Sequence, residues 1–456
     1  MKENKMGSME IKKLVTTMSI PIIISMLVQA LYNIVDSIFI ARVSESALTA
    51  VSLCYPIQMI LVAVACGTGV GINALLSRNL GLKKQKEANQ VAVHGLFLAI
   101  VNGLVFALIG FLFSKQFIQL FTNDAEILAM GISYMQICMI FSFGIFVQIT
   151  YERIMQATGN PGYNMVVQGV GALVNIILDP IFIFGYFGFP AMGVTGAAIA
   201  TVIGQIIAML LGIFITKHKV KLVQIHVREF KMDLTLINSI YKIAIPAILM
   251  QSIMSFMTVF MNMILVSFST LAVSVFSIYF KLQQFVFMAV SGITNAIIPI
   301  ISFNYGARHK NRILETIHFS LILAVGIMFV GTIVFQLFPE QLLYLFNASE
   351  DMLMIGIPAL RIISISFIFA GMSLILCSVF QALDHGKNSL IVTLLRQMII
   401  LVPLTYVLAH QFDLNISWIS FPITEGICCI LSLYYLHKVK KETINNLDNE
   451  EALLNG

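Results

Sequence analysis

Charged residues are what this sequence has least of. Only 11% of its 456 residues are Asp, Glu, Lys or Arg, whereas soluble domains carry about 25%. Apolar residues make up 59% of the chain, and the mean hydropathy is +0.93. Because a soluble protein must cover its surface with polar groups, this composition excludes a water-soluble protein and indicates an integral membrane protein.

Three further absences narrow the class. The six cysteines lie in apolar runs and form no C-x-x-C pair, which is typical of small buried side chains rather than of metal or disulfide chemistry. No G-x-x-x-x-G-K-S/T motif occurs, which argues against an ATP-driven pump. The apolar run from Leu14 continues to Ile40 without a recognisable cleavage site, which argues against a cleavable signal peptide.

Long apolar runs are what the sequence has instead. A helix needs about 20 apolar residues to cross a bilayer, and these runs do not alternate apolar and polar residues as the strands of a membrane barrel do. We therefore expect an all-α integral membrane protein with twelve transmembrane helices and no large soluble domain. The expected spans are 14–41, 50–77, 92–114, 128–151, 163–187, 193–216, 240–268, 277–303, 315–337, 352–380, 389–409 and 415–437.

The basic residues are distributed unevenly over the expected loops. With a cytoplasmic N-terminus, 22 of the 27 Lys and Arg residues lie on the cytoplasmic side, two lie in outside loops and three lie within spans. Cytoplasmic loops carry such an excess, so we expect both termini in the cytoplasm. The net charge of +5 therefore reflects topology and gives no reason to expect nucleic-acid binding.

The two halves of the sequence are similar at a constant offset of 225 residues. From Ile20 to Ala157, 28 of 138 positions are identical without a gap, and the loop S-R-N-L-G at 77–81 matches S-F-N-Y-G at 302–306. Six spans per half is an even number, so the halves form parallel six-helix repeats, as in alternating-access transporters. The expected organisation is an N-terminal lobe at 1–216, a cytoplasmic linker at 217–239, a C-terminal lobe at 240–437 and a cytoplasmic tail at 438–456.

Few acidic residues lie within the expected spans. Asp36 in span 1, Asp179 in span 5 and Glu425 in span 12 are the clear cases. An ionised side chain at the bilayer centre costs about 2.5–3.5 kcal/mol even on insertion scales, and such residues usually serve ion or substrate movement. At the offset of 225, Asp36 and Asp179 correspond to Met261 and Leu404. The repeats are therefore expected to share their geometry but not their chemistry.

Two smaller groups of charged residues accompany these acids. Glu152 lies near the cytoplasmic end of span 4. The second half carries Lys281, Arg361 and Arg396 within its spans, and Glu425 is a candidate partner for one of them. The sequence alone leaves the roles of these three basic residues and of Glu425 open.

The residues around Asp179 can supply a set of oxygen ligands. Asn175 and Asp179 are four residues apart and share one helix face. Pro180 has no N–H, so the carbonyl group of Ile176 loses its helical partner. Thr201 in span 6 can add a hydroxyl group. Hard cations such as Na⁺ prefer oxygen ligands, and a buried carboxylate also suits a proton, so these residues support either ion.

Several segments in this order resemble the multidrug and toxic compound extrusion (MATE) family, in particular its bacterial multidrug export branch. The resemblance covers roughly residues 11–440. The segments that carry it are S-I-P and N-I-V-D-S-I-F-I-A-R in span 1, the S-R-N-L-G loop, Q-A-T-G-N-P-G at 156–162, N-I-I-L-D-P-I-F-I-F-G in span 5 and G-V-T-G-A-A-I-A-T in span 6.

The resemblance implies a V-shaped pair of six-helix lobes and a secondary active multidrug efflux antiporter. Such a protein exports organic, often cationic, compounds in exchange for H⁺ or Na⁺. We therefore expect a transporter that has no enzymatic activity and needs no cofactor. We also expect it to work as a monomer in the inner membrane of a bacterium, with drugs, the coupling ion and the lipid bilayer as its partners.

The resemblance also implies a site in the first lobe. The cation or proton ligands carried over from the family are Asp36, Asn175, Asp179 and Thr201, with a backbone carbonyl group of Ala197 as a further ligand. The substrate contacts carried over are Gln29, Tyr32, Asp36 and Asp179. Another branch of the family also has acidic residues in spans 7 and 10, and this sequence has none there. Coupling is therefore expected through the first lobe only.

Three other classes of membrane protein are alternatives to this interpretation. A lipid-linked oligosaccharide or lipid flippase of the same superfamily is the main one, although such proteins often have more than twelve spans and a more basic cavity. A major-facilitator transporter is disfavoured because the loop after span 2, N-L-G-L-K-K-Q-K-E, is not rich in Asp and Arg. A membrane-embedded aspartyl protease using Asp36 and Asp179 is disfavoured because Asp179 lies in L-D-P, with no glycine beside it.

Overall fold

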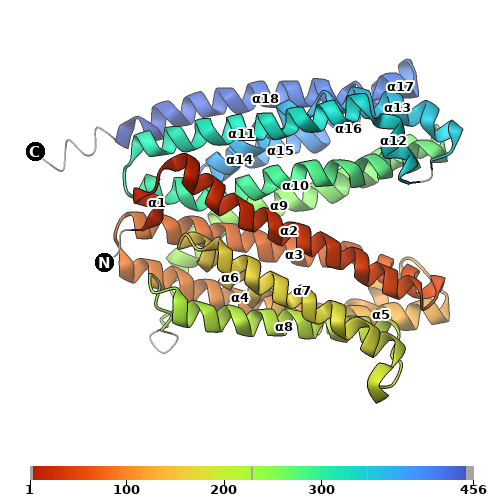
Figure 1. The fold of residues 1–456 in the computed structure, drawn as a ribbon, viewed down its shortest axis with the longest axis horizontal. Coiled ribbons are helices and arrows are strands. Elements are labelled where there is room, and N and C mark those ends of the chain that lie inside the picture. The colour runs from red at the N-terminus through yellow and green to blue at the C-terminus, as the bar shows by residue number, and fades with distance from the viewer. Residues whose placement is uncertain (1–3, 227–229, 347, 448–456) are drawn as a thin grey trace, which may run out of the picture. The chain divides into compact units, whose positions relative to one another are not determined.

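The computed structural model describes residues 4–226, 230–346 and 348–447. Within these ranges the only regular structure is helical (Figure 1). Ten helices are long and apolar enough to cross a membrane, and two further pairs of bent helices bring the number to twelve if each pair is one span. The prediction of an all-α protein with twelve helical spans is confirmed.

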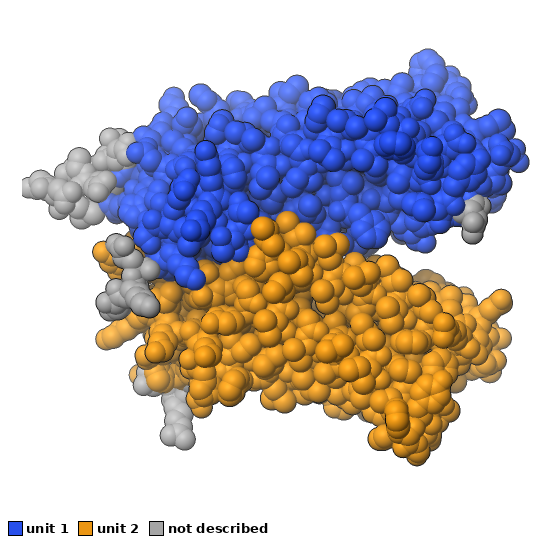
Figure 2. Space-filling view, viewed as in Figure 1, with its two compact units in different colours: residues 1–19, 249–456 blue, residues 20–248 orange. Residues whose placement is uncertain are grey.

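The chain divides into two compact units, which are coloured separately in Figure 2. Unit 2 comprises residues Ile20–Ile248, which include nearly all of the first repeat. Its helices are most of α2 (Ile11–Ala41), then α3 (Glu45–Gly81), α4 (Gln85–Gln119), α5 (Ala125–Ile140), α6 (Phe143–Ala157), α7 (Pro161–Phe184), the short η1 (Tyr186–Gly188), α8 (Val194–Lys219) and the first half of α9 (Leu234–Val266).

Unit 1 comprises Met1–Ser19 and Leu249–Gly456. It contains α1 (Lys5–Ser8), the beginning of α2, the second half of α9, and the helices of the second repeat. Those helices are α10 (Thr270–Gly306), α11 (Lys310–Leu337), α12 (Pro339–Tyr344), α13 (Glu350–Ser364), α14 (Phe367–Ala382), α15 (Gly386–Leu394), the π-helical η3 (Leu395–Ile399), α16 (Leu401–Gln411), α17 (Leu414–Ser417), α18 (Ser420–Val439) and η4 (Lys440–Ile444).

The internal repeat is visible in the backbone. Helices α3 and α10 each have 37 residues and begin and end 225 residues apart. The turns that follow them place Lys83 and Arg308 in the left-handed region, with φ of 58° and 61°. The hydroxyl group of Ser77 donates to the carbonyl oxygen of Ala157, as Ser302 does to Ala382 at the same offset. The repeat predicted from the sequence is therefore present as repeated structure.

Spans 4 and 10 are both broken near their middle, which the sequence analysis did not predict. The pairs α5–α6 and α13–α14 are bent by 44° and 48°, at Phe141–Ser142 and at Ile365–Ser366. The Ser366 hydroxyl group donates to the carbonyl oxygen of Ile363 at 2.6 Å, and such back-bonding competes with the helical hydrogen bonds and bends helices.

Span 11 departs from the repeat. Its counterpart α7 is an uninterrupted α-helix, whereas α15 and α16 are separated by the π-helical η3. The N–H group of Ile400 donates to the carbonyl oxygen of Leu395 at 2.9 Å, which is a bond across five residues. Insertions of this kind often mark functional sites.

The segments that precede the first helix of each repeat are both held by side-chain contacts. In unit 1, Asn304 and Arg312 donate to the carbonyl oxygen of Met6 at 3.0 and 2.9 Å. In unit 2, Phe230 packs against the rings of His94 and Phe97 on α4. Each unit thus binds the segment that leads into the other repeat.

The linker predicted at 217–239 includes the end of α8 and the beginning of α9. Between these helices residues 220–226 and 230–233 form no helix, and 227–229 lie outside the described residues. The predicted lobe and linker boundaries stay a prediction. They follow the sequence repeat, whereas the two compact units are defined by packing and divide the chain within α2 and α9.

Candidate cation site in unit 2

Helices α7 and α8 approach closely, and small residues make this approach possible. A Cβ atom at Gly204 would lie 2.8 Å from the carbonyl oxygen of Gly171, which leaves no room for any side chain there. Small residues at such contacts allow helices to pack closely in membranes. Helix α7 begins with Pro161 and ends at Phe184, and the next residue, Gly185, has a φ of 78°. These features bring the polar side chains of the two helices together.

Asn175 connects the two helices. In the amide orientation that satisfies its neighbours, its nitrogen donates to the Asp179 carboxylate at 3.3 Å. Its oxygen accepts from the hydroxyl group of Thr201 at 3.3 Å and from the backbone N–H of Thr201 at 3.2 Å. Asp179 is fully buried and Asn175 is 3% exposed. The structure therefore places three of the predicted ligands in direct contact.

Asp36 joins this group from α2. Its carboxyl group lies within hydrogen-bonding range of the carboxyl group of Asp179. One of its oxygens, Oδ1, is enclosed without a hydrogen-bond partner among the described residues. Two like charges this close repel each other strongly when both are ionised. A proton or a small cation between them would relieve the repulsion.

Ala197 lies near these residues but has a different environment. It is fully buried on α8, one turn before Thr201. It does not line the cavity described below. Its predicted role as a carbonyl ligand stays a prediction.

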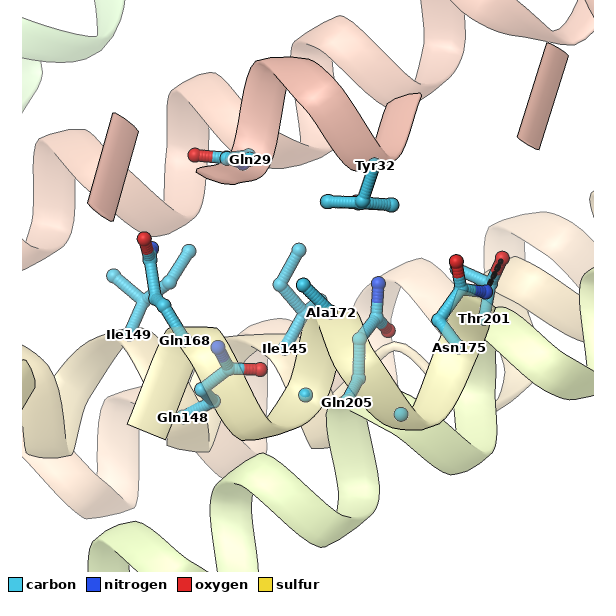
Figure 3. A pocket seen from close by; sticks show the side chains of 12 residues that line it. Gln29, Tyr32, Ile145, Gln148, Ile149, Gln168, Ala172, Asn175, Thr201 and Gln205 are labelled. Carbon is cyan, nitrogen blue, oxygen red and sulfur yellow. Dashed lines mark hydrogen bonds between the residues drawn. The ribbon is translucent and has the colours of Figure 1, made fainter. Parts of the chain in front are cut away.

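A cavity of about 60 Å³ adjoins Asn175 and Thr201 (Figure 3). This volume suits about two water molecules, since a water in the liquid occupies about 30 Å³, and drug-sized ligands need about 300–1,000 Å³. The cavity therefore has room for water or a small cation beside Asn175 and Thr201. Gln29 and Tyr32 line it from α2, whereas Asp36 and Asp179 do not. The predicted substrate contacts of these four residues stay a prediction.

Three glutamines are the polar side chains in the rest of the lining, and the sequence analysis missed them. Gln148, Gln168 and Gln205 contribute from α6, α7 and α8 (Figure 3). Gln148 and Gln168 donate to the two carboxylate oxygens of Glu152, at 3.0 and 3.3 Å. The available signal was the recurrence of Gln and Asn within spans that are otherwise apolar.

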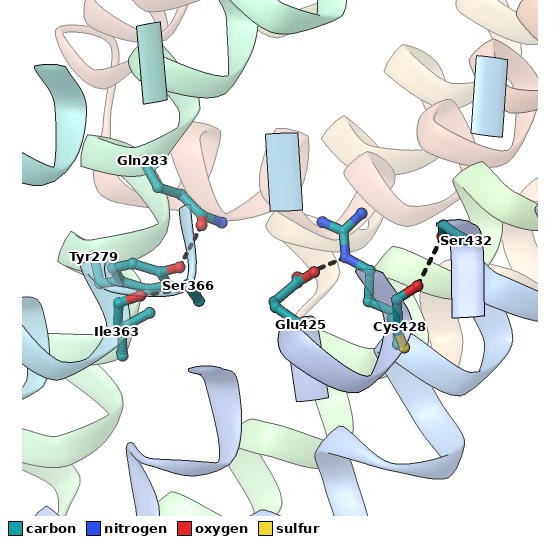
Figure 4. Close-up of polar contacts among 8 residues, drawn as sticks. Tyr279, Gln283, Ile363, Ser366, Glu425, Cys428 and Ser432 are labelled. Carbon is teal, nitrogen blue, oxygen red and sulfur yellow. Dashed lines mark hydrogen bonds and ion pairs between the residues drawn. The ribbon is translucent and has the colours of Figure 1, made fainter. Parts of the chain in front are cut away.

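The described residues of unit 1 have no acidic pair at the equivalent positions. Met261, at the position that matches Asp36, is fully buried, and Leu404 is half-buried. Its charged pair lies elsewhere: the Arg396 Nε donates to Glu425 Oε1 at 2.6 Å (Figure 4). Glu425 is therefore the partner of Arg396. Lys281 and Arg361 are exposed.

The family model described as MatE matches residues 21–181 and again residues 246–407. The chain belongs to the MatE family. The two matched ranges begin 225 residues apart, so each repeat is recognised separately. The resemblance drawn from the sequence motifs is thus confirmed, and the protein is a multi-pass membrane protein of a transporter family.

Relatives and solved structures agree with this assignment. The multidrug export protein MepA of Staphylococcus aureus strain MSSA476 is 27% identical over 426 residues, which is 92% of each chain. MepA of Staphylococcus haemolyticus is 27% identical over 438 residues, which is 96% of this chain and 94% of that one.

Among solved structures, an outward-facing multidrug resistance MATE transporter of the MOP superfamily matches with a TM-score of 0.90 and 25% identity, over 98% of this chain and 99% of the other. A MOP superfamily transporter from Pyrococcus furiosus matches with a TM-score of 0.89 and 25% identity, over 98% of this chain and 99% of the other. The binding pocket of that protein is described as having reverse polarity. The substrate class of this chain must therefore be argued from its own residues.

Proposed function

We propose that this protein is a secondary active exporter of organic, often cationic, compounds that exchanges them for H⁺ or Na⁺. The observation that carries the proposal is the contact of Asp36, Asn175, Asp179 and Thr201 in unit 2, which we call the cation site. The similarity to multidrug export proteins supports the substrate class. Its place is the inner membrane of a bacterium, where it acts as a monomer.

The chemistry of the cation site supplies a way to couple the two movements. An empty site leaves two neighbouring carboxyl groups that attract a cation, which can be the coupling ion or the charged group of a drug. Once H⁺ or Na⁺ occupies the site, the charge that attracted the drug is neutralised. Ion and drug then stabilise different states of the protein, which is the condition for coupling.

The individual residues have distinct roles in this scheme. Asp36 and Asp179 supply the negative charge, while the carbonyl oxygen of Asn175 and the hydroxyl group of Thr201 add neutral oxygen ligands of the kind that Na⁺ prefers. Ala197 is proposed as a further carbonyl ligand. Gln29 and Tyr32 are proposed to contact the substrate from α2.

The test is export of ethidium from vesicles under separate H⁺ and Na⁺ gradients. We expect one gradient to drive export in the wild type, and Asp36→Asn and Asp179→Asn to abolish it while inserting normally, because each removes a charge from the cation site. Asp351→Asn, which changes an exposed acidic residue on α13, should leave export unchanged.

Two results would contradict the proposal. Export that no gradient drives would exclude ion-coupled antiport and make a lipid-linked substrate the leading candidate. Gradient-driven export that both variants retain would place the coupling site elsewhere in the chain.

A further inference from the structure

The Arg396–Glu425 ion pair of unit 1 has no part in the proposed coupling. It joins η3 in span 11 to α18 in span 12, the same two spans of the second repeat that Asn175 and Thr201 join in the first. Both side chains are buried, with 8% of each residue exposed. Charged residues this deep in a membrane-spanning unit are costly and usually functional.

The local backbone places Arg396 in this position. Arg396 lies within the π-helical η3, the one place where span 11 departs from its counterpart α7. The bond from the N–H of Ile400 to the carbonyl oxygen of Leu395 widens the helix by one residue there. A buried ion pair adds little stability compared with apolar residues of similar volume, so stability alone is a weak reason for this arrangement.

Arg396 and Glu425 differ in which of their polar atoms lack a hydrogen-bond partner and in whether those atoms are enclosed. Of the five N–H donors of a guanidinium group, only Nε of Arg396 has an acceptor in the described part of the chain. Its two terminal nitrogens are not among the fully enclosed unpaired atoms, whereas Oε2 of Glu425 is. The side of the pair that an incoming ligand can reach is therefore the cationic side.

We propose that Arg396 is a specificity-determining residue that binds the carboxylate group of exported compounds. The two terminal nitrogens form a planar fork that matches a carboxylate in a bidentate way, which a lysine cannot reproduce. Glu425 orients the guanidinium group through Nε and leaves the fork free. The proposal rests on the export function and extends its substrate class from cations to zwitterions that carry a carboxylate.

Two polar groups near the ion pair have hydrogen-bond partners other than the terminal nitrogens of Arg396. The Tyr279 hydroxyl group donates to Gln283 Oε1 at 2.5 Å and is thereby engaged (Figure 4). Cys428, on the same helix as Glu425, accepts from Ser432 through its backbone carbonyl oxygen at 2.7 Å. In the described part of the chain, Glu425 is the one residue to which Arg396 donates a hydrogen bond, and it does so through Nε alone.

The experiment compares two probes with the same fluorescent cation. Tetramethylrhodamine carries a free carboxylate, and its methyl ester does not. Export of both is measured in vesicles with wild type, with Glu425→Gln, and with the double variant Arg396→Gln/Glu425→Gln, which removes both charges together. Arg361→Gln removes an exposed arginine of the same repeat and is the matched control.

We expect the wild type and Arg361→Gln to export both probes. Glu425→Gln should export the ester normally and the carboxylate probe at a reduced rate, because the amide oxygen can still accept from Nε but no longer carries the charge that holds the guanidinium group. The double variant should export the ester normally and the carboxylate probe about tenfold more slowly or worse, because hydrogen bonds to charged groups are worth about 1.5–3 kcal/mol. Arg396→Lys should fall between, since it keeps the charge but lacks the fork.

Equal export of the two probes by the double variant, whether both are retained or both are lost, would show that the pair only ties spans 11 and 12 together. A wild type that exports the ester but not the carboxylate probe would overturn this inference and leave the proposed function standing. A wild type that exports neither probe would contradict both.

Discussion

At the scale of single residues, the side chain of Asn175 decides the geometry of the cation site. It is the only described side chain that bonds both to Asp179 on its own helix and to Thr201 on α8. Asp179 is fully buried, so loss of this contact leaves a carboxylate without its amide donor. Loss of a hydrogen bond to a charged group costs about 1.5–3 kcal/mol.

We therefore predict that Asn175→Ala raises the concentration of driving ion needed for half-maximal export by about tenfold or more. Thr201→Val should have a smaller effect, because it removes a neutral ligand and keeps the shape of the side chain. Thr216→Val is the control, since Thr216 is a buried threonine on the same helix whose hydroxyl group has no partner in the described residues. Unchanged ion dependence in Asn175→Ala would remove Asn175 from the site.

At the scale of elements, the packing of α7 on α8 positions these side chains. A Cβ atom at Gly204 would meet the carbonyl oxygen of Gly171 at 2.8 Å and the Cβ of Asn175 at 3.3 Å. Neither atom belongs to the end of a flexible side chain, so the helices themselves must move apart. By contrast, a Cβ atom at Gly169 on α7 would have nothing within 4 Å.

These two glycines make a matched pair. Gly204→Ala should destabilise the protein by about 1–3 kcal/mol through overpacking, and should weaken ion dependence because it pushes Asn175 away from Thr201. Gly169→Ala should be neutral or stabilising, because alanine is favoured over glycine in helices by about 1 kcal/mol. Thermal unfolding in detergent and ion-dependent export would check both. Equal melting temperatures for the two variants would mean that α7 and α8 tolerate separation.

Some features of the helices can be predicted from the sequence pattern, and others cannot. The spans, the repeat and the helix-face contact of Asn175 with Asp179 follow from apolar runs, a fixed offset and a spacing of four residues. The bends at Phe141–Ser142 and Ile365–Ser366 and the π-helical η3 do not, because no proline stands at any of the three to mark a break in the helix. They depend on hydrogen bonds and packing between helices that are distant in sequence.

The sequence likewise indicated some residues of the site and not others. The sequence pointed to Asp36 and Asp179 because acids are rare in the spans, and the structure places them in contact. The sequence did not indicate Gln148, Gln168 and Gln205. Glutamine carries no charge, so its presence in an apolar run is a weaker sign of a functional site than an acidic residue. Pairing of Glu425 with Arg396 rather than with another base required the fold, since the two are 29 residues apart.

At the scale of the whole molecule, the basic residues predict how the chain lies in the membrane. With the N-terminus inside, 22 of 27 Lys and Arg residues fall on the cytoplasmic side. The even number of spans places the C-terminus on the same side. The loop between α4 and α5 should then be outside, and η4, which follows the last span, should be inside.

Cysteine labelling in intact cells tests this topology. Asn123→Cys places a thiol on the exposed loop between α4 and α5, and Glu442→Cys places one on the exposed face of η4. We expect a membrane-impermeant maleimide to label Asn123→Cys in intact cells and Glu442→Cys only after permeabilisation. The wild type supplies the background, which should be low because four of its six cysteines are buried. The reverse labelling pattern would place both termini outside the cell. The basic loops would then face outward, contrary to the prediction.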